Sequence, residues 1–246
     1  MDVKTALTSL FILAAPVCFA QQQNNIPTGL NAQQNLNELA SDRIGGLVRT
    51  YDNRYSGIKG TPFFLENWGK ASLVLNGKTK YDNVVLKYNV YDNTILYRKP
   101  DGSVLELNTN NLDYFILQDS LGLKNYMFKR TPELAAIDKK AGTQFNAILY
   151  EGSKYKLLLN PSKSLLKADY KGGYSANRTH DELLTENAYY IVKSDKTAQK
   201  VKLNKKNLLK VLANEQQKVQ AYLEKEKIDA GTEDGWIKVL NYYESL

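Results

Sequence analysis

The chain has 246 residues, of which 43% are hydrophobic and 24% are charged, and its formal net charge is +7. These values exclude a chain that is disordered throughout, and they suffice for one large domain with its own core. Tyrosine is unusually frequent, with 17 Tyr against 7 Phe and 2 Trp, which indicates β-sheets with one partly exposed face. The lysines are scattered among acids, as on a solvated surface. The alternative is an anionic partner such as a polysaccharide, a lipid head group or, least expected, a nucleic acid.

The first 20 residues have the pattern of a secretory signal peptide. Lys4 supplies the positive charge, an apolar run covers 6–17, and Ala20 ends a cleavage motif of small residues. The run is shorter than the roughly 20 apolar residues of a membrane span, although a retained anchor is the alternative. Cleavage after Ala20 would remove Cys18, the only cysteine, so we expect neither a disulfide nor a cysteine metal site. The pattern predicts an exported protein that is periplasmic or extracellular, or peripheral to the outer membrane, without a transmembrane segment after signal removal.

Residues 21–45 are rich in Gln and Asn, and we expect a flexible segment that can form a short helix. Residues 46–203 alternate short β-type runs with turn residues, which predicts an antiparallel β domain. Asn76-Gly77 and Pro100-Asp101-Gly102 favour tight turns in it. A short helix is predicted at 162–167. The predicted strands are 47–51, 71–75, 84–91, 94–98, 104–107, 114–118, 126–129, 145–150, 155–159, 189–193 and 200–203.

Residues 204–246 have helical periodicity and predict a C-terminal helical segment packed on the β domain. Asn204 and Thr232 suit the N-caps of helices, and Asn214 suits a break between them. The predicted fold is mainly β (α+β), with about nine to eleven strands in an antiparallel meander. This meander must curl into a barrel-like sheet or form a sandwich to hide its apolar face.

Three segments resemble a group of uncharacterised secreted, β-rich proteins of Bacteroidota-type bacteria. They are Lys59-Gly60-Thr61-Pro62-Phe63 with Trp68, the strand region 84–97, and the tail 204–243. The resemblance implies a bacterial protein of the cell envelope. It implies neither an activity nor a site residue.

Residues that carry catalytic chemistry are few, and we predict no catalytic residue, no metal site and no cofactor. The only histidine, His180, is followed by Asp181 and Glu182, but adjacent side chains diverge, so we interpret it as an exposed loop residue or the start of a helix. Nucleophile-elbow and phosphate-loop motifs are absent from the sequence. A glycoside hydrolase with two carboxylates is the weakest alternative. Its candidate acids are Glu66, Asp82, Glu106, Asp113 and Glu151.

Aromatic residues give the stronger functional indication. Exposed rings on a sheet can stack on sugars or line an apolar cavity, and core or cross-strand packing is the alternative. The candidate ligand-binding residues are Trp68, Tyr81, Tyr88, Tyr91, Tyr97 and Tyr114. We therefore expect non-catalytic binding of an unknown envelope ligand or protein partner, and no nucleic acid.

The second hypothesis is a structural or assembly factor that docks through its C-terminal helices. Its docking stripe would comprise Leu208, Leu212, Val219 and Leu223, which recur at helical spacing. Packing of this stripe on the sheet is the alternative.

Overall fold

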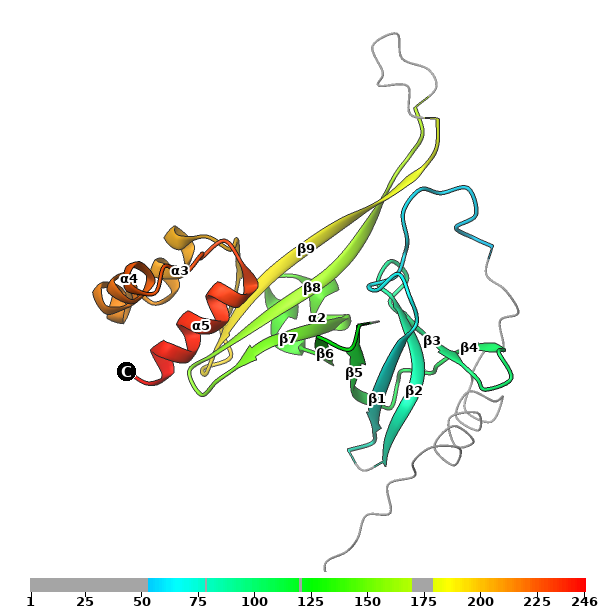
Figure 1. Ribbon diagram of the computed structural model, residues 1–246, viewed down its shortest axis with the longest axis horizontal. Coiled ribbons are helices and arrows are strands. Elements are labelled where there is room, and N and C mark those ends of the chain that lie inside the picture. Colours follow the sequence, from blue (N-terminus) through cyan, green and yellow to red (C-terminus); the bar gives the residue numbers. More distant parts are fainter. Residues whose placement is uncertain (1–52, 78, 120, 170–178) are drawn as a thin grey trace, which may run out of the picture.

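A computed structural model describes residues 53–77, 79–119, 121–169 and 179–246 (Figure 1). The predicted signal peptide with its cleavage site at Ala20, the segment 21–45 and the strand 47–51 lie outside these residues. In the described part, ten strands form one sheet in the order β10-β9-β8-β7-β6-β5-β1-β2-β3-β4, with every pair antiparallel. The sheet is curled and unclosed. The prediction of a mainly β fold with C-terminal helices is therefore confirmed.

Short strands joined by tight turns build the first part of the sheet. Asn76 and Gly77 have φ values of 51° and 65°, and Gly102 has 85°, so these predicted turns use the left-handed region that Asn and Gly tolerate. The strand order departs from a simple meander at one point, because β1 lies between β2 and β5. The strands are β1 (Gly69–Leu75), β2 (Thr79–Asn89), β3 (Thr94–Arg98), β4 (Val104–Glu106), β5 (Leu112–Gln118), β6 (Asn125–Arg130), β7 (Phe145–Glu151), β8 (Tyr155–Leu166), β9 (Glu182–Lys193) and β10 (Ala198–Val201).

Alternation along the strands separates a core face from an outer face. On β2, Val84, Leu86 and Tyr88 are buried, whereas the intervening Val85 and Lys87 are only half-buried. The core face is rich in aromatic rings: those of Phe115 and Phe128 stack at 4.8 Å, and Tyr88 meets both edge-on at 5.5 and 5.2 Å. This core is built from β1–β7 and from Leu159 of β8.

The C-terminal helices cover the core face of the other end of the sheet. They are α3 (Lys205–Val211), the 3-10 turn η2 (Ala213–Glu215), α4 (Gln216–Lys225) and α5 (Glu233–Glu244). Asn204 and Thr232 cap α3 and α5 by accepting hydrogen bonds from Asn207 N and Gly235 N, as predicted. The predicted stripe (Leu208, Leu212, Val219 and Leu223) is buried and packs with Leu157 and Ile191 of the sheet. No helix in the described part of the chain has the length and apolar character needed to cross a bilayer.

Two short elements that sequence reasoning missed cover the outer face of the same end. They are η1 (Pro132–Ala136) and α2 (Lys139–Thr143). Leu134, with an exposed fraction of 0%, packs there with Leu158 and Tyr190. Leu157 and Leu158 are neighbours on β8 and face opposite sides, so this end of the sheet is covered on both faces.

The predicted helix at 162–167 is wrong, because residues up to Leu166 extend β8. β9 correspondingly begins at Glu182, seven residues before the predicted strand 189–193. β7 pairs with β8 no further than Leu159, so the paired segments 160–166 and 182–188 form a two-stranded arm. Figure 1 shows this arm projecting from the sheet. Cross-strand pairing overrides the local preference of this segment.

Candidate functional site

The structure places three of the six predicted aromatic residues in the core. Tyr81, Tyr88 and Tyr97 have exposed fractions of 5%, 1% and 0%. The Tyr88 hydroxyl has one proton to donate, and its two acceptors are Asn93 Oδ1 at 2.9 Å and the carbonyl oxygen of Phe145 at 3.3 Å. Burial raises the pKa of Tyr88. These three tyrosines pack the core and present no ring to a ligand.

Tyr91 and Tyr114 are half-buried but take part in other arrangements. Tyr91 packs edge-on against Tyr55, with ring centres 6.1 Å apart. Burial, with a hydrogen bond to Asp92, raises the pKa of Tyr55 to about 12, and Arg54 pairs with the same carboxylate at 2.9 Å. Tyr114 lies on the outer face, where β5 pairs with β1 and β6. The described contacts do not bring either residue to Trp68.

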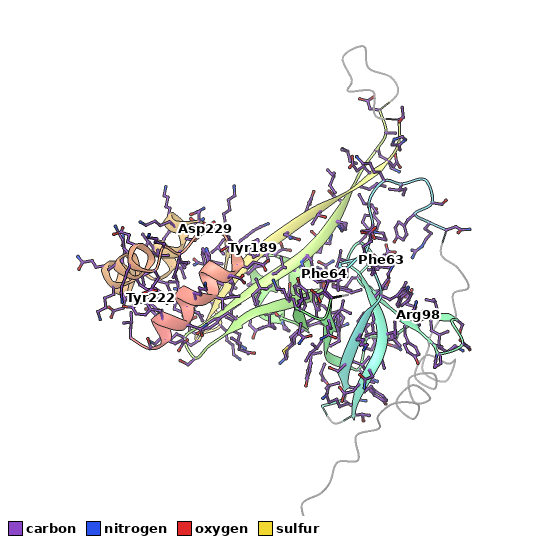
Figure 2. The ribbon with its side chains drawn as sticks, viewed as in Figure 1. Phe63, Phe64, Arg98, Tyr189, Tyr222 and Asp229 are labelled. Atoms are coloured by element: carbon purple, nitrogen blue, oxygen red, sulfur yellow. The ribbon has the colours of Figure 1, made fainter. Side chains whose placement is uncertain are left out.

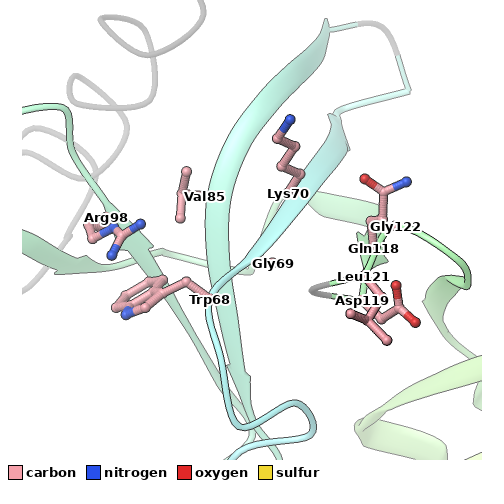
Figure 3. Close-up of a pocket in the computed structure, with 9 residues that line it drawn as sticks. All are labelled: Trp68, Gly69, Lys70, Val85, Arg98, Gln118, Asp119, Leu121 and Gly122. Atoms are coloured by element: carbon pink, nitrogen blue, oxygen red, sulfur yellow. The ribbon is translucent and has the colours of Figure 1, made fainter.

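Trp68 lines a cavity of about 440 Å³ at one end of the curled sheet (Figure 3). The Trp68 ring and Arg98 stand on one side, and residues from the end of β5 and the following loop stand on the other. The described lining residues are Trp68, Gly69, Lys70, Val85, Arg98, Gln118, Asp119, Leu121 and Gly122.

The register of three strands creates the cavity. Val85 of β2 pairs with Lys70 of β1 and with Arg98 of β3, so these three side chains share a row on the outer face. Gly69 lets β1 approach β5, because a Cβ at Gly69 would lie 2.4 Å from the carbonyl oxygen of Gln118. The aromatic segment before β1 alternates in the same way: Phe64 packs on Phe128 in the core, whereas Phe63 faces Lys87.

Two cations lie against the Trp68 ring. The Arg98 guanidinium is 5.1 Å and Lys87 Nζ is 5.5 Å from the ring centre, and Lys87 Nζ is also 4.5 Å from the centre of the Phe63 ring. Figure 2 shows Phe63 and Arg98 in the β1–β4 half of the molecule, away from Tyr222 in the helical end. These contacts are cation–π interactions, which partly replace the water that the cations lose.

The positive charges of Lys87 and Arg98 are only partly balanced by negative charge nearby. Burial lowers the pKa of Lys87, the charge of the exposed Glu66 opposes that shift, and the smaller effect of the Arg98 charge lowers the pKa further. Within the described residues, neither Lys87 nor Arg98 lies within ion-pairing distance of a carboxylate. Two adjacent cations in a partly desolvated position repel each other, and an anion between them would remove that repulsion.

The loop after β5 adds an apolar rim. Leu121 and Leu123 are the most exposed of the large hydrophobic residues described, at 77% and 81%. Gly122 between them has a φ of 71°, and Asp119 holds the turn by accepting hydrogen bonds from Gly122 N at 3.0 Å and Leu123 N at 2.8 Å.

Sequence reasoning found Trp68 and placed Lys87 opposite the core, but it missed Lys70, Arg98 and the two leucines as site residues. The sequence around the two leucines could have indicated their exposure, because large apolar residues on both sides of a glycine in a hairpin loop cannot reach the core. No local sequence pattern could have indicated Arg98, because its proximity to Trp68 depends on strand pairing.

The other candidate groups lie elsewhere. His180 is exposed and contacts the hydroxyl of Thr179, and no cluster of three metal-binding side chains occurs among the residues described. The candidate acids are dispersed over the sheet: Asp82 pairs with Lys80 at 3.1 Å, and Glu151 pairs with Lys156. Asp113 accepts a hydrogen bond from Gly77 N, and Glu106 lies on the edge strand β4.

Comparisons of the chain with protein-family models, with curated proteins and with solved structures give no match. The geometry and charge of the Trp68 cavity therefore carry the functional argument.

Proposed function

We propose that the protein is a non-catalytic binding protein of the cell envelope that takes an anionic ligand at the Trp68 cavity. One observation carries this proposal: Arg98, which lines the cavity, and Lys87, which does not, both lie against the Trp68 ring, and neither forms an ion pair with a carboxylate of the described residues. The envelope location rests on the signal-peptide pattern of residues 1–20.

The lining groups indicate the chemistry of the ligand. A guanidinium binds carboxylates and phosphates through two parallel hydrogen bonds, and Lys70 is a second cation in the lining beside Arg98. Trp68, Val85 and Leu121 provide apolar surface beside these charges. Cavities of about 300–1,000 Å³ are typical of small-ligand sites, and this cavity lies within that range. The ligand we infer is a carboxylate- or phosphate-bearing molecule with a ring or chain that packs on the indole.

The number of carboxyl groups in the cavity supports binding rather than catalysis. Among the described lining residues, Asp119 is the one carboxylate, and its Oδ1 accepts the N–H of Leu123. General acid–base hydrolysis of glycosides uses two carboxyl groups at one site.

The two tryptophans of the chain give a direct test, because Trp236 is fully buried and Trp68 is half-buried. Fluorescence quenching is measured with iodide and with caesium, each relative to its quenching of free N-acetyltryptophanamide. We expect iodide to quench Trp68 more strongly, because Lys87 and Arg98 attract anions. Equal quenching by the two ions would contradict a cationic environment at this ring.

The binding of different ligand classes is then compared in two ways. One is the decrease in iodide quenching of Trp68 fluorescence when the ligand is added, and the other is calorimetry. The probes are inorganic phosphate, trigalacturonate and, as a neutral control, maltotriose. We expect the anions to bind and Arg98→Gln or Lys87→Gln to weaken binding about tenfold or more, since a hydrogen bond to a charged group contributes about 1.5–3 kcal/mol. Lys193→Gln, an exposed lysine at the end of β9, is the matched control. If all three variants bind alike, the cavity is not the anion site.

A further inference from the structure

The loop segment Leu121–Lys124, which we name the leucine loop, presents apolar side chains to solvent beside the cavity. Leu121 and Leu123 are 77% and 81% exposed, and Leu121 also lines the cavity. Exposing two large aliphatic side chains at one turn is unfavourable in water, so a contact that buries them would recover hydrophobic free energy.

The loop is held in this conformation. Asp119 accepts hydrogen bonds from the N–H groups of Gly122 and Leu123, and Asp119 N donates to the carbonyl of Lys124 at 2.9 Å. The left-handed φ of Gly122 produces a tight turn. Because the backbone is fixed by three hydrogen bonds, the leucines do not need to be ordered when they enter a partner, which lowers the entropic cost of binding.

Cations surround the leucine loop. Lys70 and Arg98 are exposed and line the cavity, Lys87 lies against the Trp68 ring, and the Lys124 side chain is 46% exposed at the end of the loop. Nearby carboxylates balance part of this charge: Glu233 pairs with Lys124 at 3.2 Å, and the exposed Asp234 and Glu66 act on Lys124 and Lys87. Asp119 accepts hydrogen bonds from the loop backbone. Exposed apolar residues with flanking cations are the pattern of proteins that attach to the surface of anionic membranes.

We propose that the leucine loop inserts into the surface of an anionic lipid bilayer while the Trp68 cavity receives a phosphate-bearing lipid head group. The proposal rests on the proposed function, because the head group is then the anionic ligand of the cavity. A bilayer fits better than a soluble anion, because the cavity alone leaves both leucines mostly in water. Two leucines and a few cations give weak, reversible and salt-dependent attachment.

The first experiment locates the loop relative to the lipid. Leu123→Trp is compared with Ile137→Trp. Ile137 is the C-cap residue of η1 and is 48% exposed. The full chain carries each substitution and is mixed with vesicles of equal phosphatidylglycerol and phosphatidylcholine brominated in the acyl chains. We expect additional quenching for the residue 123 variant alone. Equal quenching of the two variants, or none at residue 123, would overturn insertion of this loop.

The second experiment separates the bilayer from a soluble ligand. The double variant Leu121→Ser/Leu123→Ser should bind the same vesicles at least about tenfold more weakly than the wild type. The single variant Leu123→Ser, whose residue is not among the described lining residues of the cavity, should also bind vesicles more weakly but keep the wild-type affinity for inorganic phosphate. Unchanged vesicle binding by the folded double variant would overturn the proposal. If the wild type binds phosphate but no vesicles, the bilayer proposal fails and the anion-binding proposal stands. If it binds neither, both fail.

Self-association is measured in the same samples. Dimerisation that disappears in the leucine double variant, observed by sedimentation without lipid, would assign the leucine loop to a second copy of the chain. That result would overturn attachment to a bilayer. A monomer before and after the substitutions, together with vesicle binding by the wild type, supports it.

Discussion

Replacing Gly60 with alanine should loosen the outer end of the β8–β9 arm, and Gly57→Ala is its matched control. Both glycines precede β1 and have left-handed φ values, 86° at Gly60 and 79° at Gly57. A Cβ at Gly60 would lie 2.8 Å from the carbonyl oxygen of Leu183, whereas a Cβ at Gly57 would meet nothing within 4 Å. The two variants therefore share the backbone strain and differ in the steric clash.

The magnitude follows from the contacts at this point. A left-handed φ costs an L-residue about 1–2 kcal/mol, so Gly57→Ala should lower the free energy of unfolding by about that amount. In Gly60→Ala the clash must also displace a backbone pairing. Lys59 N donates to the carbonyl of Asp181, and Leu183 N donates to the carbonyl of Lys59, each at 2.9 Å. Losing two such hydrogen bonds costs a further 1–3 kcal/mol or so, for a total of about 2–5 kcal/mol.

Urea unfolding gives the free energies, and amide hydrogen exchange locates the change. We expect faster exchange of the Leu183 amide in Gly60→Ala than in Gly57→Ala, with little change at the Ile191 amide in the covered part of β9. The reasoning is refuted if the two variants are equally stable. It is refuted as well if Leu183 exchanges at the same rate in both, because the arm would then not depend on this pairing.

Further predictions concern the covered end of the sheet. Leu134→Ala should lower the free energy of unfolding by about 2–5 kcal/mol, because Leu134 is 0% exposed, whereas Ile137→Ala, at 48%, should change it by less than about 0.5 kcal/mol. A smaller loss at Leu134 than at Ile137 in urea unfolding would show that η1 does not seal the outer face. Tyr190→Phe removes the hydrogen bond that the hydroxyl donates to Asp138 Oδ2 at 2.6 Å and should cost about 1.5 kcal/mol at pH 7. The Ala141 N–H and the Tyr190 hydroxyl hold the pKa of Asp138 below its usual value, so their stabilisation is present above about pH 4 and is lost as the pH falls through the lower folded-state pKa. The wild type and the variant should therefore converge in stability in strong acid, and a constant difference from pH 7 to pH 2 would contradict this linkage.

Much of the sheet could be predicted because its signals are local. The alternation of Val84, Leu86 and Tyr88 fixes which face of β2 is buried, whatever strand lies beside it. The strand Thr94–Arg98 has its predicted bounds, and Asn204 and Thr232 cap helices as expected. Each of these features depends on residues within about one turn or one hairpin.

The candidate site was predictable only in part. Trp68 stood out as a large aromatic residue beside a predicted strand, and Lys87 fell on the face opposite the core. Tyr81, Tyr88 and Tyr97 carried the same signal as Trp68, yet they are buried. Composition and alternation cannot tell a tyrosine that packs a core from one that faces a ligand, because both satisfy the preference of tyrosine for strands.

The sequence by itself determined where the chain alternates, turns and caps, and hence a curled antiparallel β fold with terminal helices. Tertiary structure alone decided that β1 lies between β2 and β5, that β8 continues as an arm, and that Arg98 meets Trp68. The physical reason is the range of the interactions. Propensity and hydrophobic period act between near neighbours, whereas strand register is settled by contacts between residues that are distant in the chain.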